Sequence, residues 1–312
     1  MVRTHVVQNL FAFYQNEGKT LHTAKKELLD SFASTYSLYI LLFDFVNELT
    51  AYAQERLEQS AAHARATHAY CPSNRRFIDN RFAKQVFDNK TVRHFMEEQK
   101  MGWDAGLTAV SSVYKQLLDT PFYAEYMEAD EVTYEDDKRI WRRIFAELLP
   151  ENEALLSALE EMEVALDFSN WTTDIDVVLS FVVKTVKRFK EEAGADQELL
   201  PMFDTEDELA FATDLFVKAV EHHDEYDGLV VAHLKNWDAD RIAYMDKIIL
   251  QAALTEILCF PEIALEISFN EYLEIAKEYS GNKSHIFING IMTEILRELI
   301  HDNKLRKAAM LR

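Results

Sequence analysis

The stretch from Ser284 to Leu299 reads SHIFINGIMTEILREL, and its apolar side chains return at intervals of three and four residues. Ile288, Ile291, Ile295 and Leu299 therefore share one stripe of an amphipathic α-helix. Ser284 stands where it can cap this helix, because a serine hydroxyl accepts a hydrogen bond from a free backbone N–H group. The sequence thus predicts a helix that starts near Ser284 and buries one side.

The same spacing recurs outward from this stretch, and turn-forming residues are scarce throughout the chain. The 312 residues include 7 Gly and 5 Pro. Sheet proteins need frequent tight turns, and those turns recruit Gly and Pro. Hydrophobic residues make up 48% of the chain, which is enough for a sizeable core. We therefore predict an all-α fold.

The charge balance limits what the chain can bind. Lys and Arg number 33 and Asp and Glu number 54, so the formal charge is 33 − 54 = −21. Such a chain repels nucleic acid at long range, because phosphate attraction is the sequence-independent part of that binding. Any contact with RNA must therefore be local. The one basic stretch, Arg56 to Arg93, is interleaved with His63, His68, Tyr70, Phe77 and Phe82, and its simplest interpretation is a solvated face.

Catalytic motifs are absent from the sequence. There is no Gly-x-Gly-x-x-Gly loop, no P-loop, no His-Glu-x-x-His and no Gly-x-Ser-x-Gly, so we expect no enzyme and no cofactor. The run His222-His223-Asp224-Glu225 could bind a metal, but adjacent histidines point to different helix faces, so no metal site is expected. Two distant cysteines, the lack of a long apolar run and the lack of a signal sequence predict a cytoplasmic protein.

Several helix boundaries can be predicted in the last third of the chain. Thr205 to Glu208 and Ser268 to Glu271 both have the capping-box pattern, in which two side chains satisfy free N–H groups at a helix start. Asp238 can cap a helix that runs to about Phe260, because Pro261 prevents its continuation. Earlier in the chain, residues 21–67 predict two helices, or one with a break near Ser34.

Three blocks near the C-terminus and one near the N-terminus carry a family resemblance. The blocks are Asn236-Trp237 through Ala253-x-x-Glu256-Ile257-Leu258, then Ile267-x-x-Asn270-Glu271-x-x-Glu274-Ile275-Ala276-Lys277, then Ser284-His285-x-Phe287-x-Asn289-Gly290, and finally Val7-Gln8-x-Leu10-Phe11. They resemble the transcription antitermination factor NusB family, in its long form with a large insert after the first helix.

The resemblance implies an all-α protein of two small helical bundles with an additional helical insert. Residues 1–18 would be the first helix of the NusB-like core, residues 19–200 the insert, and residues 201–312 the C-terminal domain. The segment from Gly194 to Asp204 is the clearest internal boundary. We expect residues 20–200 to be helices packed on the NusB-like core rather than a catalytic domain.

The resemblance also implies a function and a set of site residues. NusB pairs with NusE, a ribosomal small-subunit protein, and the two bind the boxA element of nascent RNA in the transcription elongation complex, which allows read-through in ribosomal RNA operons. Acidic family positions match Asp240 and Asp246, which we expect to be exposed to that basic partner. Phe287 could either stack an RNA base or pack in the core. The positions expected to bind RNA are Arg3, His5, Phe11, Lys283, Ser284, His285 and Phe287.

Departures from the family pattern leave two alternatives open. The run of arginines expected before the first helix is reduced to Arg3, Phe11 replaces the usual tyrosine, Gln251 stands where many members have arginine, and Ile286 stands where a basic residue is common. These changes favour a NusB-derived helical protein-interaction module without RNA binding. A fragment of an RNA methyltransferase is the other alternative, and the absence of a Gly-rich cofactor loop opposes it.

Overall fold

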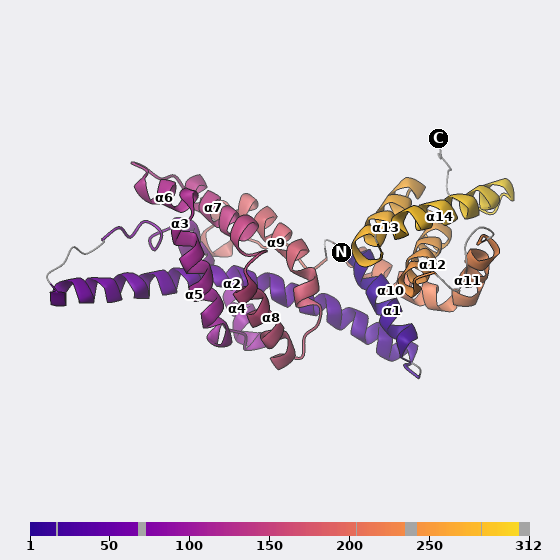
Figure 1. The fold of residues 1–312 in the computed structure, drawn as a ribbon, viewed down its shortest axis with the longest axis horizontal. Coiled ribbons are helices and arrows are strands. Elements are labelled where there is room, and N and C mark those ends of the chain that lie inside the picture. The colour runs from indigo at the N-terminus through magenta and orange to yellow at the C-terminus, as the bar shows by residue number, and fades with distance from the viewer. Residues whose placement is uncertain (17, 68–72, 204, 235–241, 282, 306–312) are drawn as a thin grey trace. The chain divides into compact units, whose positions relative to one another are not determined.

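The computed structural model describes residues 1–16, 18–67, 73–203, 205–234, 242–281 and 283–305 (Figure 1). Every regular element in these ranges is a helix, so the predicted all-α fold is confirmed. The chain forms two units. Met1–Asp30 with Phe203–Arg312 is the first unit, and Ser31–Met202 is the second. Within the described residues, no helix is both long and apolar enough to cross a membrane.

The first unit is built from the two ends of the chain. Its helices are α1 (Val2–Gln15), α10 (Glu206–Glu221), α11 (His223–Ala232), α12 (Tyr244–Cys259), α13 (Leu265–Tyr279) and α14 (Ser284–His301), together with the first residues of α2 (Leu21–Thr67). The division proposed from the sequence places the core at residues 1–18 and 201–312. This division remains a proposal, and its bounds differ from those of the first unit, Met1–Asp30 and Phe203–Arg312.

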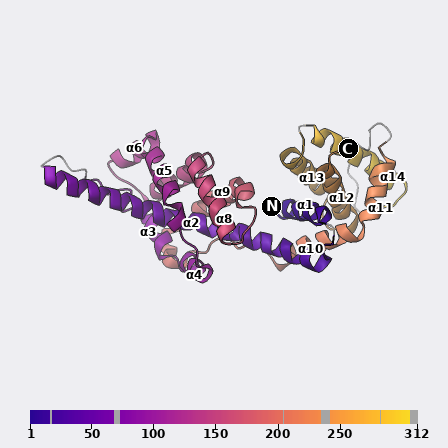
Figure 2. The same cartoon turned by 60° about the horizontal axis from the view of Figure 1, so that its bottom comes forward.

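Helix α12 is the centre of the first unit. It contacts α1, α10, α11, α13 and α14, which surround it in both ribbon views (Figures 1 and 2). A helix that is apolar on all sides has to be enclosed by other elements. The buried apolar side chains of α12 are Ile248, Ile249, Leu250, Ala252, Ala253, Leu254 and Ile257.

The predicted helix boundaries in this unit meet different outcomes. The Thr205 hydroxyl accepts a hydrogen bond from the Glu208 N–H at 3.3 Å, so the Thr205 half of the predicted capping box of α10 is confirmed. The cap predicted at Ser268 is wrong. Helix α13 already begins at Leu265, about one turn before Ser268. The Leu265 side chain is buried, and its packing favours the earlier start. Asp238 lies outside the described residues.

The second unit contains the helices between the two parts of the first. They are the remainder of α2, then α3 (Arg81–Asp88), α4 (Lys90–Gln99), a 3₁₀ turn (Asp104–Gly106), α5 (Leu107–Leu118), α6 (Pro121–Glu128), α7 (Tyr134–Arg143), a π-helical turn (Ile144–Leu148), α8 (Glu153–Ala165), α9 (Trp171–Arg188) and a second 3₁₀ segment (Glu191–Asp196). The helical content predicted for residues 20–200 is confirmed for the described part, and their packing on the NusB-like core stays a prediction.

Helix α2 organises the second unit, whose other helices lie along it (Figure 2). It has no break at Ser34, where the hydroxyl instead donates to the Ser169 carbonyl at 2.6 Å and accepts from the Ser169 N–H at 2.9 Å. The apolar run from Leu38 to Phe43 is buried on all sides. Among the described residues, the buried members of the core around it come from residues 38–189, and the partly buried ones from residues 36–200, so this unit has a hydrophobic core of its own.

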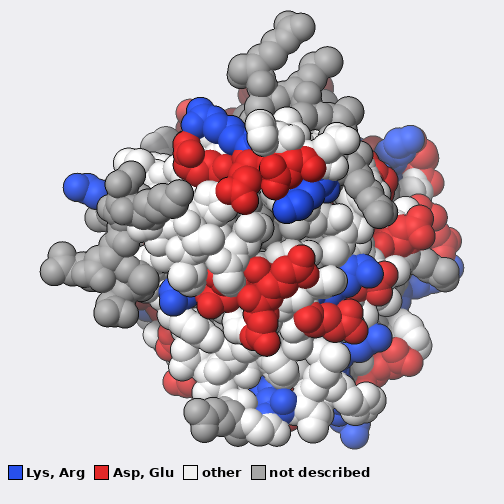
Figure 3. Space-filling model, turned by 90° about the vertical axis from the view of Figure 1, so that its right-hand side faces the viewer, with Lys and Arg blue, Asp and Glu red and all other residues white. Residues whose placement is uncertain are grey.

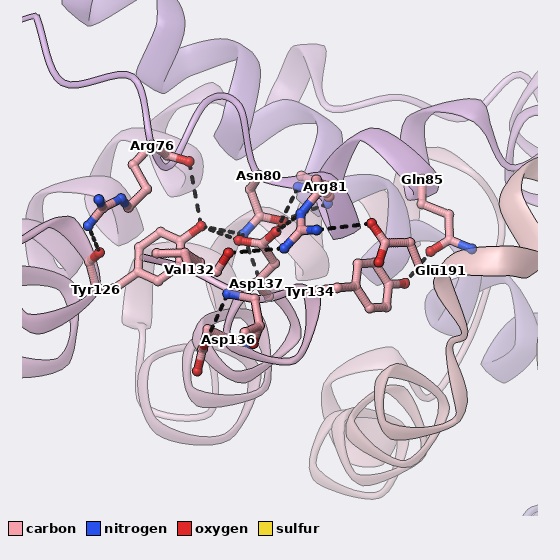
Figure 4. A network of polar contacts seen from close by, with 12 residues as sticks. Arg76, Asn80, Arg81, Gln85, Tyr126, Val132, Tyr134, Asp136, Asp137 and Glu191 are labelled. Atoms are coloured by element: carbon pink, nitrogen blue, oxygen red, sulfur yellow. Dashed lines mark hydrogen bonds and ion pairs between the residues drawn. The ribbon is translucent and has the colours of Figure 1, made fainter. Parts of the chain in front are cut away.

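A buried carboxylate joins three helices of this unit (Figure 4). Asp137 of α7 is 3% exposed and accepts hydrogen bonds from the Arg81 N–H at 3.2 Å, the Arg81 Nε at 3.0 Å and the Tyr126 hydroxyl at 2.6 Å. Burial and the neighbouring Asp137 raise the pKa of Tyr126 above its ordinary value, so the hydroxyl remains a donor. The network therefore fixes α3 and α6 against α7.

Replacing this carboxylate tests its structural role. We expect Asp137→Ala to lower the free energy of unfolding by about 2–4 kcal/mol, because it removes the acceptor of the buried Tyr126 hydroxyl and of two N–H donors of the part-exposed Arg81. Urea denaturation followed by tryptophan fluorescence measures this effect, since Trp103, Trp141 and Trp171 all lie in the second unit.

Asp196→Ala is the matched control for this measurement. Asp196 pairs with Lys90 at 2.6 Å, and both side chains are more than 70% exposed, so its loss should cost less than about 1 kcal/mol. Equal effects of the two substitutions would show that the Asp137 network does not hold the helices together.

The pH dependence of stability tests the environment of Tyr39. Its hydroxyl lies 2.8 Å from the Thr185 hydroxyl, and burial raises its pKa from 10.0 to about 12. The folded state therefore keeps this proton in a pH range where the unfolded state has lost it. This stabilisation is complete below about pH 10 and is lost as the pH rises through about 12. The urea midpoint of Tyr39→Phe should fall less steeply than that of the parent protein between pH 10 and 12; parallel curves would contradict the assignment.

Candidate nucleic-acid interface

An ion pair ties the first residues of the chain to the central helix of the first unit. The Arg3 guanidinium donates from Nε to Glu256 Oε2 at 2.8 Å and from Nη2 to Glu256 Oε1 at 2.9 Å. The Tyr272 hydroxyl donates to Glu256 Oε2 at 3.0 Å. Glu256 is fully buried, and its two oxygens are thus satisfied by residues of α1 and α13.

The electrostatics of this group follow from its burial. Desolvation alone would lower the pKa of Arg3, but hydrogen bonding and attraction to Glu256 exceed that effect, and the pKa is raised. Burial and the adjacent Glu256 charge raise the pKa of Tyr272. Sequence reasoning missed this role of Glu256, although a carboxylate in the middle of an apolar helix was an available signal.

Arg3 therefore has a structural role, since it pairs with the buried Glu256. Its remaining described contacts are with Glu271, 3.8 Å away, and with the ring of Phe211, whose centroid lies 5.4 Å from the guanidinium carbon. These residues belong to α13 and α10 rather than to the start of α14. The RNA contact expected of Arg3 stays a prediction, and the bidentate pair with Glu256 already uses two nitrogens of the guanidinium.

The other two expected contacts of α1 also face inward. His5 is fully buried among the residues that line the core side of α1. Phe11 is half-buried, and its ring meets the Tyr244 ring edge-on at a centroid distance of 5.6 Å. Helix α1 thus exposes little of the side chains predicted to bind RNA.

Asp246, expected to be an exposed partner contact, is buried at the start of α12. It is 5% exposed and accepts hydrogen bonds from the Ser280 hydroxyl at 2.5 Å and the Ser284 hydroxyl at 3.1 Å. The expected exposure of Asp246 is wrong, because its carboxylate turns toward hydroxyls that join α12 to the start of α14. Ser284 is buried as the first residue of α14, and its hydroxyl donates to Asp246, so the predicted Ser284 cap is wrong. Asp240 lies outside the described residues.

The segment at the start of α14 divides into exposed and buried positions. Lys283 is exposed and His285 is half-buried. Phe287 is only 6% exposed, because its helical position aligns it with Ile288 and Ile291 on the buried side of α14. The expectation of an exposed Phe287 ring for base stacking is wrong, and the alternative of core packing is confirmed.

A cavity of about 200 Å³ opens between α11 and α12 in the first unit. Next to it, Gln251 donates to the Tyr14 hydroxyl at 2.8 Å and to the Ala219 carbonyl at 2.5 Å. Burial raises the pKa of Tyr14 to about 12. The cavity is lined by His223, Tyr226, Asp227, Val230, Tyr244, Lys247, Ile248 and Gln251.

The histidine pair beside this cavity does not form a metal cluster in the described chain. His222 bonds to the Glu225 carboxylate at 2.9 Å, whereas the His223 ring lies against Tyr14 at a centroid distance of 4.4 Å. Within the described ranges, no group of three His, Cys, Asp or Glu side chains is arranged to hold a metal ion.

The surface charge is predominantly negative on the face drawn in Figure 3, where red carboxylates gather in groups and the blue cations are more scattered. Exposed carboxylates of α13 and α14 include Glu271, Glu274, Glu294 and Glu298. Because like charges repel phosphate, an RNA strand on the first unit needs a specific local contact.

Comparison with known proteins gives the family context. The NusB family model matches residues 182–297. Transcription antitermination protein NusB of Salinibacter ruber is 34% identical over 132 residues, which cover 40% of this chain and 82% of that protein. Its namesake in Koribacter versatilis is 38% identical over 102 residues, 32% of this chain and 70% of the relative. No solved structure matches the chain.

A further relative, from Thermodesulfovibrio yellowstonii, is 33% identical over 125 residues, or 40% of this chain and 78% of the relative. The alignments cover more than two thirds of each relative but less than half of this chain. The resemblance carried by the sequence blocks is thereby confirmed, and the chain belongs to the NusB family as a longer member with additional helices.

Proposed function

We propose that this protein acts in transcription antitermination by binding boxA-type RNA together with a NusE-like ribosomal small-subunit protein. In this role it joins the transcription elongation complex in the cytoplasm, regulates ribosomal RNA operons and catalyses no reaction. The observation that carries the proposal is the family match over residues 182–297, most of which fold into the first unit.

Lys283 is the strongest RNA-binding candidate in the first unit. Its side chain is exposed and makes no ion pair with any residue in the described ranges. It stands at the N-cap of α14, where the partial positive charge of the helix end favours phosphate. His285, two residues further along, is half-buried and supplies a second polar group. Phe287 supports this segment from the core side.

The competing function, a protein-interaction module without RNA binding, is favoured by a different observation. Arg3 is paired with the buried Glu256, and His5 is fully buried, so two of the expected RNA contacts are used by the fold. The formal charge of −21 gives no compensating general attraction. Direct measurement of RNA binding separates the two functions.

The first test concerns Lys283. We expect Lys283→Glu to weaken binding of a boxA-like single-stranded RNA and to lower the slope of log affinity against log salt by about 0.7, the value for one lost phosphate contact. Because the side chain is exposed, the melting temperature should not change. Fluorescence anisotropy across a salt series, with and without the NusE-like protein, measures the effect.

Arg297→Glu is the matched control, since it makes the same charge change further along α14 at a side chain that is 67% exposed. We expect it to retain parental RNA affinity. Equal losses in the two variants would show an effect of net charge alone. An unaffected Lys283→Glu variant would favour the interaction module.

The second test separates partner binding from stability. We expect Asp240→Lys to weaken binding of the NusE-like protein in calorimetry, because a basic ribosomal partner favours an acidic contact. Asp246→Ala should instead lower the free energy of unfolding by about 1.5–3 kcal/mol, because it removes the charged acceptor of the Ser280 and Ser284 hydroxyls. Weaker partner binding by Asp246→Ala without loss of stability would contradict this division of roles.

A further inference from the structure

We propose that the exposed cations at the C-terminal end of α9 form a second, sequence-independent contact for the phosphate backbone of RNA. This surface, called here the α9 basic end, consists of Lys184, Lys187, Arg188 and Lys190. The inference rests on the proposed function, because RNA is the polyanion that the function supplies.

The α9 basic end is unusual in a chain of net charge −21. Residues 182–190 read VVKTVKRFK, with four cations and no carboxylate. The first three cations follow helical spacing of three and four residues, so they project from one face of α9. All four side chains are exposed, whereas Val182, Thr185 and Val186 face the core.

These cations have no carboxylate partner within the described part of the chain. Two of the three acidic residues of the second 3₁₀ segment are engaged elsewhere, and the third, Glu192, is exposed two positions after Lys190. Glu191 pairs with Arg81 at 3.1 Å, as Figure 4 shows, and Asp196 pairs with Lys90 at 2.6 Å. Cations of α3 and α4 thereby neutralise charges that would otherwise oppose the α9 basic end.

The cations are also not needed to complete the end of the helix. Basic side chains near a helix C-terminus often bond its last carbonyls. Here Lys138, which is 3% exposed, donates to the Phe189 carbonyl at 2.9 Å, and Gln85 donates to the Lys190 carbonyl at 3.0 Å. The buried Lys138 and Gln85 thus fix this segment, and the exposed cations remain available to a ligand.

The composition of this face favours a nucleic acid over a protein. Stable protein interfaces contain an apolar core, and no large apolar side chain of α9 is exposed in the structure as described. Phe181 is half-buried, and the Lys184 ammonium lies 5.1 Å from its ring centroid. A row of charges without an apolar anchor suits a phosphate backbone.

The test uses the full chain and a salt series of fluorescence anisotropy with two single-stranded RNAs, one boxA-like and one scrambled. We expect the triple variant Lys184→Glu, Lys187→Glu, Arg188→Glu to lose at least about tenfold in affinity for both RNAs at low salt. The slope of log affinity against log salt should fall by about 2, from three lost phosphate contacts at about 0.7 each. The ratio of boxA-like to scrambled affinity should stay unchanged.

A matched control makes the same charge change elsewhere in the second unit. Arg56→Glu, Arg65→Glu, Lys115→Glu alters three exposed cations that form no ion pair with a described residue. We expect this variant to keep most of the parental salt slope. Equal losses in the two triple variants, or no loss in the α9 variant, would overturn the proposal. A glutamine version of the α9 variant keeps the test valid if the glutamate version does not fold.

The outcomes separate this inference from the proposed function. A parent protein that binds both RNAs equally, with binding lost in the α9 variant, supports the α9 basic end and contradicts boxA recognition. A parent protein that prefers boxA-like RNA, together with an α9 variant of unchanged affinity, supports boxA recognition and contradicts the α9 basic end. Displacement of RNA by polyglutamate at equal charge concentration would overturn RNA as the ligand and indicate an acidic protein.

Discussion

The first unit depends on the burial of one charged carboxylate. Glu256 sits in the middle of α12, fully enclosed, and an uncompensated charge there would cost several kcal/mol. Its partners are Arg3, 253 positions away in the sequence, and Tyr272. Because these side chains must meet at Glu256, α1 has to lie against α12 despite the long segment that separates them in the chain.

This constraint also changes which residues are free to bind RNA. Arg3 cannot both neutralise Glu256 and act as a free cation, and Asp246 cannot both hold Ser280 and Ser284 and reach a partner from an exposed position. Among the residues expected to bind RNA at the start of α14, Lys283 is exposed and His285 is half-buried. The proposed RNA contact of the first unit is thus a small described surface on an acidic background.

The second unit also contains a buried carboxylate, that of Asp137. Asp137 is as deeply buried as Asp246, and it is satisfied by Arg81 and Tyr126 within the same unit. Together with the separate hydrophobic core, this local satisfaction means that the added helices need no polar group from the first unit for these buried charges. The same arrangement leaves the α9 basic end exposed, since Lys138 rather than a surface cation completes the helix.

The sequence by itself determined the helical class and the stripe of α14, because these depend on local spacing and on the rarity of Gly and Pro. Its sequence blocks carried the family resemblance. It also predicted the Thr205 cap, which is a contact within one turn. It did not determine that Arg3 and Asp246 are used inside the fold or that α13 starts before Ser268. Only the tertiary structure decided these points, because the burial of a side chain depends on helices that are distant in the sequence. Arg3 and Glu256, for example, are 253 positions apart.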